Sequence, residues 1–283
     1  MMPKKQLFTG SVYTHDSWDE YWEGSLKRNN GNIGTLTTQT TTWSGDYGVT
    51  NRLNFIASVP YVWTNASQGV LHGQQGFQDI TLAAKFSFVD RPFTEFGRIR
   101  AIAVVSGGIP LTNYTPDFQP LSIGLASKRI ATRFTLYFES RPGWFLNGST
   151  AYTWRGNVTL DRPYYYTNGQ LFLTNEVAMP NVFDYSVSSG YRKHGFMIPV
   201  TFTQQRVQGG GDIRRQDMPF VSNRMNYSRI GGLVMYRIPF WKFRGLAPLF
   251  SFNYILDGRN VGQSTIYSVG LMYFANFSRR PIQ

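Results

Sequence analysis

The chain has 283 residues, of which 28 are Lys or Arg and 16 are Asp or Glu, so its formal net charge is +12. Only 16% of the residues are charged, against about 25% in a typical soluble domain, and aromatic residues make up a further 16%. The aromatic content excludes a disordered chain, and the absence of any long apolar run excludes a helical membrane protein. The chain has no cysteine, which excludes disulfides, cysteine metal ligands and cysteine nucleophiles.

Alternating polar and apolar residues define about twelve predicted strands along the chain. Turn residues separate these segments, and no stretch has the 3.6-residue period of an amphipathic helix. The predicted strands span residues 6–14, 33–45, 50–64, 77–89, 97–109, 120–138, 143–156, 181–192, 195–206, 226–238, 244–256 and 262–277.

The connections between these strands alternate in length. The longer ones, rich in polar, Gly and Pro residues, are 15–32, 65–76, 110–119, 157–180 and 207–225. The last connection, 257–261, is short and departs from the alternation. Short turns that alternate with long loops around an even number of antiparallel strands are typical of transmembrane β-barrels, whose short turns are periplasmic. We therefore predict an all-β fold, an antiparallel transmembrane β-barrel of about twelve strands (roughly 10 to 14), formed by residues 1–283 as a single domain. Its main loops are expected near 15–32, 157–180 and 207–225.

The composition of the two strand faces favours a barrel over a soluble sandwich or jelly roll, which is the alternative fold. The polar face holds mostly Ser, Thr, Asn, Gly and Gln, as expected of a confined aqueous lumen. The other face is predicted to contact lipid at Leu82, Phe86, Phe252, Tyr254 and Leu271. Aromatic residues also collect at strand ends, as they do at membrane interfaces: Trp43, Trp63, Trp144, Trp154 and Trp241.

Charged residues on the polar faces are the candidates for the lumen lining. They are Arg52, Asp79, Lys85, Arg98, Arg100, Asp184 and Arg229. Arg98 and Arg100 share a face because they are two residues apart on one strand. The nearest acids on lumen faces are expected to be Asp79, Asp184 and Glu139, which are too few to neutralise the cations. An excess of positive charge in a confined space favours anions. Two alternatives stay open: the charges hold strand register, or the arginines sit at a periplasmic rim and contact lipid head groups.

Three short motifs lie between residues 47 and 88. Tyr47, Gly48, Thr50, Arg52 and Leu53 form a Tyr-Gly-x-Thr-x-Arg-Leu turn and strand, and Val59–Tyr61 form a Val-Pro-Tyr end. Gly76, Asp79, Lys85 and Phe86 form a strand that differs from Gly-x-Gly-Asp by Gln78, and Gly107–Pro110 form a later element. These motifs resemble the outer-membrane family of the meta-pathway of phenol degradation, the MetA-like transporters. The resemblance implies an outer-membrane barrel related to hydrocarbon and fatty-acid channels, and passive transport of hydrophobic or aromatic compounds.

Other function classes lack the residues they need. Outer-membrane phospholipases are similar in size and carry a His-x-Ser-Asn-Gly motif. Here His15 and Ser17 have that spacing, but Trp18 replaces the Asn, and both residues lie in or beside a predicted loop. No histidine has a plausible Ser and acid partner on one strand face, so we expect no enzyme, no cofactor and no metal site. The basic residues are dispersed along the chain, so we expect no nucleic-acid binding.

The sequence therefore predicts an outer-membrane channel or facilitator for passive uptake of small molecules. The alternative is a non-conducting barrel that acts as a scaffold or partner in an envelope complex. The expected partners are outer-membrane lipid and lipopolysaccharide, a small-molecule permeant, and the barrel-assembly machinery, whose signal the aromatic strand ending at Phe277 resembles. We expect a monomer or a component of an envelope complex in the cell outer membrane. Met1–Lys5 has a basic patch without an apolar stretch, so a signal peptide is expected to have been removed or mis-assigned.

Overall fold

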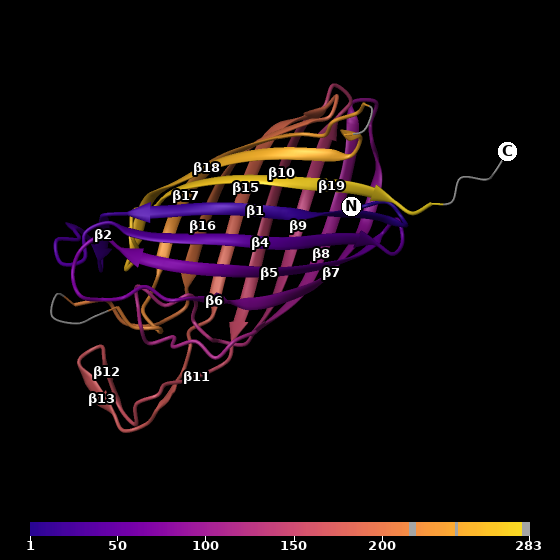
Figure 1. Ribbon diagram of the computed structural model, residues 1–283. Coiled ribbons are helices and arrows are strands. Elements are labelled where there is room, and N and C mark those ends of the chain that lie inside the picture. The colour runs from indigo at the N-terminus through magenta and orange to yellow at the C-terminus, as the bar shows by residue number, and fades with distance from the viewer. Residues whose placement is uncertain (215–218, 241–242, 279–283) are drawn as a thin grey trace.

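Twelve long antiparallel strands form a closed barrel (Figure 1). The structure is a computed structural model and describes residues 1–214, 219–240 and 243–278. The barrel strands are β1 (Gln6–Trp18), β4 (Leu36–Gly48), β5 (Leu53–Ala66), β7 (Asp79–Phe93), β8 (Gly97–Pro110), β9 (Arg129–Ser140), β10 (Trp144–Arg155), β15 (Val182–Lys193), β16 (Phe196–Val207), β17 (Asn226–Tyr236), β18 (Leu246–Arg259) and β19 (Thr265–Asn276). The predicted fold class and strand number are confirmed.

The barrel closes between its first and last strands. Each long strand pairs with the next one along the chain, and β19 returns to pair with β1, with Gln6 opposite Asn276 and Ser17 opposite Thr265. The short strand β6 (Gln75–Phe77) continues the pairing along β5 beyond the end of β7. A closed sheet pairs the backbone groups of its edge strands, as a bilayer requires because hydrocarbon offers no hydrogen bonds.

The two ends of the barrel differ in their connections. Three small hairpins lie in the long connections at one end: β2 (Glu20–Glu23) with β3 (Leu26–Asn29), β11 (Val158–Thr159) with β14 (Glu176–Val177), and β12 (Tyr165–Thr167) with β13 (Gln170–Phe172). The opposite end carries the short turns and lies next to the N-terminus (Figure 1). In outer-membrane barrels the short turns are periplasmic, so the hairpins mark the extracellular end.

Over the part of the chain that the structure describes, no helix is both long enough and apolar enough to cross a membrane.

Apolar side chains cover the outside of the barrel. Leu82 is 57% exposed, Phe86 46%, Phe252 39% and Leu271 52%, as predicted for lipid-facing positions. Tyr254 shares the outward face of β18 with Phe252 and is half-buried. Exposing such an apolar surface to water would be unfavourable, whereas the hydrocarbon of a bilayer accommodates it.

Aromatic side chains also mark the strand ends. Trp43, Trp144 and Trp154 are exposed on the outside, and Trp63 is half-buried. Trp241 lies outside the described residues.

One predicted strand was too long. The expected strand over 120–138 begins at Arg129, and residues 111–128 form a connection instead. Leu121 and Ile123 in this connection are buried, which shows that it folds inward against the barrel. The alternation of Leu121, Ile123 and Leu125 imitates a strand in the sequence, although these side chains pack a loop.

The predicted end of the first strand, at residue 14, was too early. The first strand runs to Trp18, so His15 and Ser17 belong to β1 and not to a loop. They stand opposite Tyr267 and Thr265, whose side chains face outward with the rest of the outer face of β19.

A β-bulge in β7 changes which side chains face the lumen. Up to Ser87 the odd-numbered residues point inward, and the register with β8 then shifts between Ser87 and Val89. The extra residue, Phe88, reverses the alternation, so that Asp90 points inward opposite Arg100.

Candidate functional site

The candidate lumen residues fall at two levels of the barrel. Lys85, Arg98 and Arg100 lie toward the periplasmic end on the inward faces of β7 and β8. Asp79, Asp184 and Arg229 lie in the extracellular half, on the inward faces of β7, β15 and β17.

Arg52 is the exception among the predicted lumen residues. It lies in the turn between β4 and β5 and is exposed, because β5 begins only at Leu53. Its position is therefore the periplasmic rim of the barrel, outside the strand wall.

Charged side chains of β7, β8 and β9 form a network at the periplasmic end. Asp90 forms ion pairs with both Arg98 and Arg100, and Arg100 Nε lies 3.2 Å from Asp90 Oδ1. Arg100 Nη1 also donates to Glu139 Oε2 at 3.3 Å. The two arginines thus share two carboxylates, of which Glu139 was expected from the sequence and Asp90 was not.

Two of the acids in the lumen were missed by the sequence reasoning. Asp90 was placed in a turn, because the bulge at Phe88 leaves no mark in the pattern of apolar residues. Asp46 was also placed in a turn, although β4 continues to Gly48 and Asp46 pairs with Lys85 on the inner face of the barrel wall. A search for acids within two residues of a predicted strand end would have found both.

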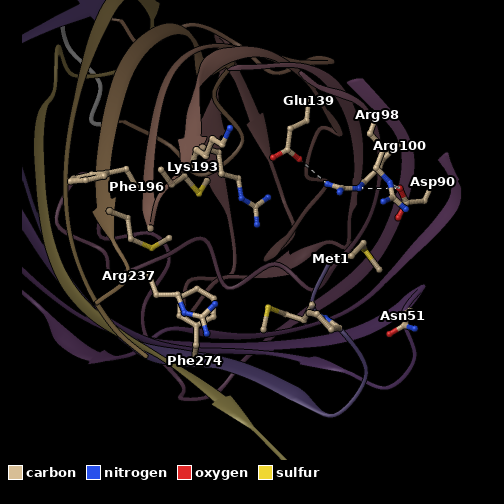
Figure 2. Close-up of a pocket in the computed structure, with 16 residues that line it drawn as sticks. Met1, Asn51, Asp90, Arg98, Arg100, Glu139, Lys193, Phe196, Arg237 and Phe274 are labelled. Atoms are coloured by element: carbon tan, nitrogen blue, oxygen red, sulfur yellow. Dashed lines mark hydrogen bonds and ion pairs between the residues drawn. The ribbon is translucent and has the colours of Figure 1, made fainter. Parts of the chain in front are cut away.

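A cavity of about 630 Å³ adjoins this network at the periplasmic end of the lumen (Figure 2). Arg192 and Lys193 from the end of β15 line it, and Arg237 lies across the cavity from Arg98, with its guanidinium 4.4 Å from the centre of the Phe274 ring. Residues 1–3 also contribute to the lining.

Positive charge dominates this cavity. Its described lining has five basic side chains and two carboxylates: Arg98, Arg100, Arg192, Lys193 and Arg237 against Asp90 and Glu139. The basic side chains outnumber the carboxylates by three, so this lining has an excess of positive charge. Such a confined potential stabilises anions and destabilises cations.

At the extracellular end, Asp79 anchors the connection 111–128 inside the barrel. Asp79 is 3% exposed, pairs with Arg129 of β9, and accepts a hydrogen bond from the Tyr114 hydroxyl at 2.6 Å. Thr64 on the inward face of β5 donates to the Leu121 carbonyl at 2.6 Å. Burial, followed by the hydrogen bond to Asp79, raises the pKa of Tyr114 above its usual value, so this hydroxyl stays protonated as a donor.

Three extracellular connections pack into a cap with its own apolar core. The core joins connections 156–181, 208–225 and 111–128 through Val158, Leu160, Tyr165, Val177, Met179, Phe220, Val221 and Leu125. The Tyr165 ring stacks on Phe220 at 5.2 Å. Arg162 binds Asp117 through two contacts, at 2.6 and 3.0 Å, and lies over the Phe220 ring. Arg162 therefore links all three connections.

The 208–225 connection is also joined to the end of β18, through a group of contacts that we call the Asp212 clasp. Arg259 binds Asp212, with Nε donating to Oδ1 at 2.7 Å, and Asn260 Nδ2 donates to the same oxygen at 2.8 Å. The Asn260 side-chain oxygen accepts the backbone N–H of Gly24 and of Ile213, both at 2.9 Å. The hydrogen bond from Arg259 is the main cause that lowers the pKa of Asp212.

A closed twelve-strand barrel with a polar, charged lumen and an apolar exterior defines an outer-membrane β-barrel of the channel and porin type. The chain belongs to the family described as "Putative MetA-pathway of phenol degradation", whose sequence model matches residues 28–257.

A solved outer-membrane channel shares this fold. The chain is similar to the COG4313 outer membrane channel from Pseudomonas putida F1, with 12% sequence identity, a TM-score of 0.74 and 97% of each chain covered. It is also similar to the NanC porin, with 11% identity, a TM-score of 0.48, and 93% of this chain and 98% of that chain covered. The translocator domain of autotransporter NalP from Neisseria meningitidis has 10% identity and a TM-score of 0.45, with 95% of this chain and 87% of that chain covered. No curated protein sequence matches the chain.

Proposed function

We propose that the protein is a passive outer-membrane channel for small molecules and that it favours anions. The observation that supports this most directly is the periplasmic cavity, where five basic side chains face two carboxylates. The family and the fold support the channel itself, and the charge of the lining supports its preference.

The lining also bears on the chemistry of the permeant. The resemblance to hydrocarbon channels suggests hydrophobic or aromatic compounds, but hydroxyl and guanidinium groups give an uncharged hydrocarbon no partner and would have to be desolvated. An aromatic or aliphatic compound would enter such a lumen more readily as a carboxylate, because the arginines bind that group.

The extracellular cap favours a second candidate, a barrel that does not conduct and serves as a scaffold in the envelope. Three connections pack around a common core at the extracellular end. In this case the cap would present a fixed surface to a partner.

Recordings from the purified protein in planar lipid bilayers test both candidates. Stepwise conductance supports the channel, and persistent silence supports the scaffold. In a salt gradient the reversal potential should show a preference for chloride over potassium. Arg98→Glu with Arg100→Glu should shift the preference toward cations, because the substitution places two further carboxylates beside Asp90 and Glu139.

The matched control makes the same change in net charge on the outward face of the barrel. Arg91→Glu with Arg206→Glu alters exposed side chains opposite Ile99 and Phe183 and should leave the reversal potential unchanged. A reversal potential that is also unchanged in the Arg98 and Arg100 variant would show that these arginines do not line the pore.

A further inference from the structure

A second polar region lies in the extracellular half of the lumen, away from the periplasmic cavity. On the neighbouring strands β10, β15 and β16, Ser149, Ser186 and Thr203 stand opposite one another in the register of the sheet. Their side chains lie on the inward face, and the hydroxyls of Ser149 and Ser186 are 2.9 Å apart. We call these three side chains the hydroxyl row.

An arginine lies at each end of the hydroxyl row. Arg229 of β17 stands opposite Thr203 in the register. At the other end, Arg133 of β9 donates from Nη1 to Ser149 Oγ at 3.0 Å. The hydroxyl row and its two arginines therefore extend over five adjacent strands of the lumen wall, from β9 to β17.

These two arginines differ from those of the periplasmic network. Arg133 is exposed although it lies on the inward face, which means that the lumen at this level is open to water. Within residues 1–214, 219–240 and 243–278, neither Arg133 nor Arg229 forms an ion pair. Their guanidinium groups are therefore available to an anion from solution, whereas Arg98 and Arg100 are held by Asp90.

One carboxylate, Asp184, lies beside the hydroxyl row, two residues before Ser186 on β15. Arg133, Arg155 and Arg229 all lie within electrostatic range of Asp184. Three cations around one carboxylate leave the region positively charged, and Asp184 weakens that charge without cancelling it.

We infer that the hydroxyl row and its two arginines bind a sugar acid, that is, a small carboxylate that carries several hydroxyl groups. A guanidinium binds a carboxylate through paired, charge-assisted hydrogen bonds. Each Ser or Thr hydroxyl has one donor and two acceptor positions, so the hydroxyl row keeps free positions after the contact between Ser149 and Ser186. This inference rests on the proposed function, because the site lies on the path that a permeant would take.

Other small molecules would use only part of this site. A carboxylate without hydroxyl groups would engage an arginine and leave the hydroxyl row to water. A neutral sugar would use the hydroxyl row and leave the arginines without a partner. Of these three classes, only a sugar acid uses both kinds of group, so it should bind more tightly than either of the other two.

Calorimetric titration of the folded barrel in detergent separates these classes. The probes are D-glucuronate, D-glucose and cyclohexanecarboxylate, which share a six-membered ring and differ in charge and hydroxyl groups. We expect glucuronate to bind about tenfold or more tightly than either of the others, because it adds several hydrogen-bonding hydroxyl groups to cyclohexanecarboxylate and a carboxylate to glucose.

Substitutions assign the two contributions. Arg133→Gln should weaken the binding of both acids by about tenfold or more, because it removes a charge-assisted contact. Ser149→Ala with Ser186→Ala should weaken the binding of glucuronate and leave the affinity for cyclohexanecarboxylate unchanged. The control is Arg206→Gln on β16, which removes the same charge from the outward face opposite Phe183 and should change neither affinity.

The variant Asp184→Asn distinguishes loss of the site from misfolding of the barrel. Removing this carboxylate should tighten the binding of both acids, a gain that a damaged barrel would not produce. If cyclohexanecarboxylate binds as tightly as glucuronate, or if Asp184→Asn leaves the affinities unchanged, the sugar-acid site is overturned.

Bilayer recordings distinguish failure of the site from failure of the channel. A silent barrel that binds glucuronate preferentially would support the site and contradict the channel. A conducting barrel without this preference would support the channel and overturn the site.

Discussion

Asp90 and Arg100 are held together across the β7–β8 hairpin, with Arg100 Nε 3.2 Å from Asp90 Oδ1. Without the bulge at Phe88, Asp90 would point into lipid, because the even-numbered residues of β7 before the bulge face outward. One inserted residue therefore places a carboxylate in the lumen, where it pairs with two arginines.

Removing that carboxylate should strengthen the preference for anions. Asp90→Asn leaves Arg98 and Arg100 with one carboxylate, Glu139, in place of two, so the chloride preference measured by reversal potential should rise. The stability loss should be about 1 kcal/mol or less, since these side chains are partly exposed. Asp161→Asn, in an exposed extracellular connection, is the control of equal charge. A reversal potential that moves equally in both variants would show that net charge, and not the lumen position, sets the preference.

A charge on the outer face should oppose folding into a bilayer. Leu82→Arg places a cation on the lipid-facing side of β7, at a cost of about 2–4 kcal/mol near the midplane. Ala83→Arg is the matched control, because the adjacent side chain points into the lumen and should fold nearly normally. The yield of folded barrel in lipid vesicles measures the difference. Equal yields would contradict the assignment of the two faces.

The last strand should be needed for insertion in the cell. Tyr273 and Phe277 are both exposed, at 45% and 58%, and belong to the aromatic pattern that resembles an assembly signal. Tyr273→Ala with Phe277→Ala should abolish insertion. Phe250→Ala with Phe252→Ala removes two outward aromatic side chains from the preceding strand and should reduce insertion much less. Surface levels of the protein report the outcome, and wild-type levels in the first variant would disprove a signal role.

The cap should loosen when its central ion pair is broken. Arg162→Ala removes the link between connections 111–128, 156–181 and 208–225, and should make the cap more sensitive to limited proteolysis. The barrel itself should keep its thermal stability, because an exposed pair contributes about 0–1 kcal/mol. Arg162→Asp with Asp117→Arg should restore part of the protection. If the reversed pair is cleaved as fast as Arg162→Ala, the ion pair does not hold the cap.

The Asp212 clasp should release in acid. Arg259 lowers the pKa of Asp212, so the ionised form stabilises the folded connection above the unfolded value of about 3.9. That stabilisation is lost as the pH falls from about 4 through the lowered pKa. Hydrogen exchange of the Ile213 amide, corrected for its intrinsic rate, should therefore be constant from pH 7 to about pH 4 and faster below. Asp212→Asn should remove this acid dependence, and an unaltered profile in the variant would assign the change to another group.

The regular parts of this fold could be predicted from the sequence because a barrel in a membrane has strict alternation. Leu82 and Leu271 were placed on the outer face by their period alone, and twelve strands were counted from turns and loops. Positions that depend on irregular geometry could not be predicted in this way. Asp90 follows a bulge, and Leu121 alternates like a strand residue inside a connection.

The alternation of polar and apolar residues also could not predict the partners of the charged side chains. Asp79 was identified as a lumen acid, but its contacts with Tyr114 and Arg129 depend on how residues 111–128 fold back into the barrel. Arg133 falls on an inward face by alternation, yet its contact with Ser149 depends on the register between β9 and β10.

The pairing of β1 with β19 also bears on how long the folded barrel lasts. Gln6 and Asn276 meet at this seam although they lie near opposite ends of the chain. Joining such distant segments costs more chain entropy than closing a hairpin between neighbouring strands, because the loop that must be closed is longer. The seam is therefore expected to form last, so substitutions along it should mainly speed unfolding and leave the folding rate to the hairpins. The lifetime of the barrel is then set where its two end strands meet.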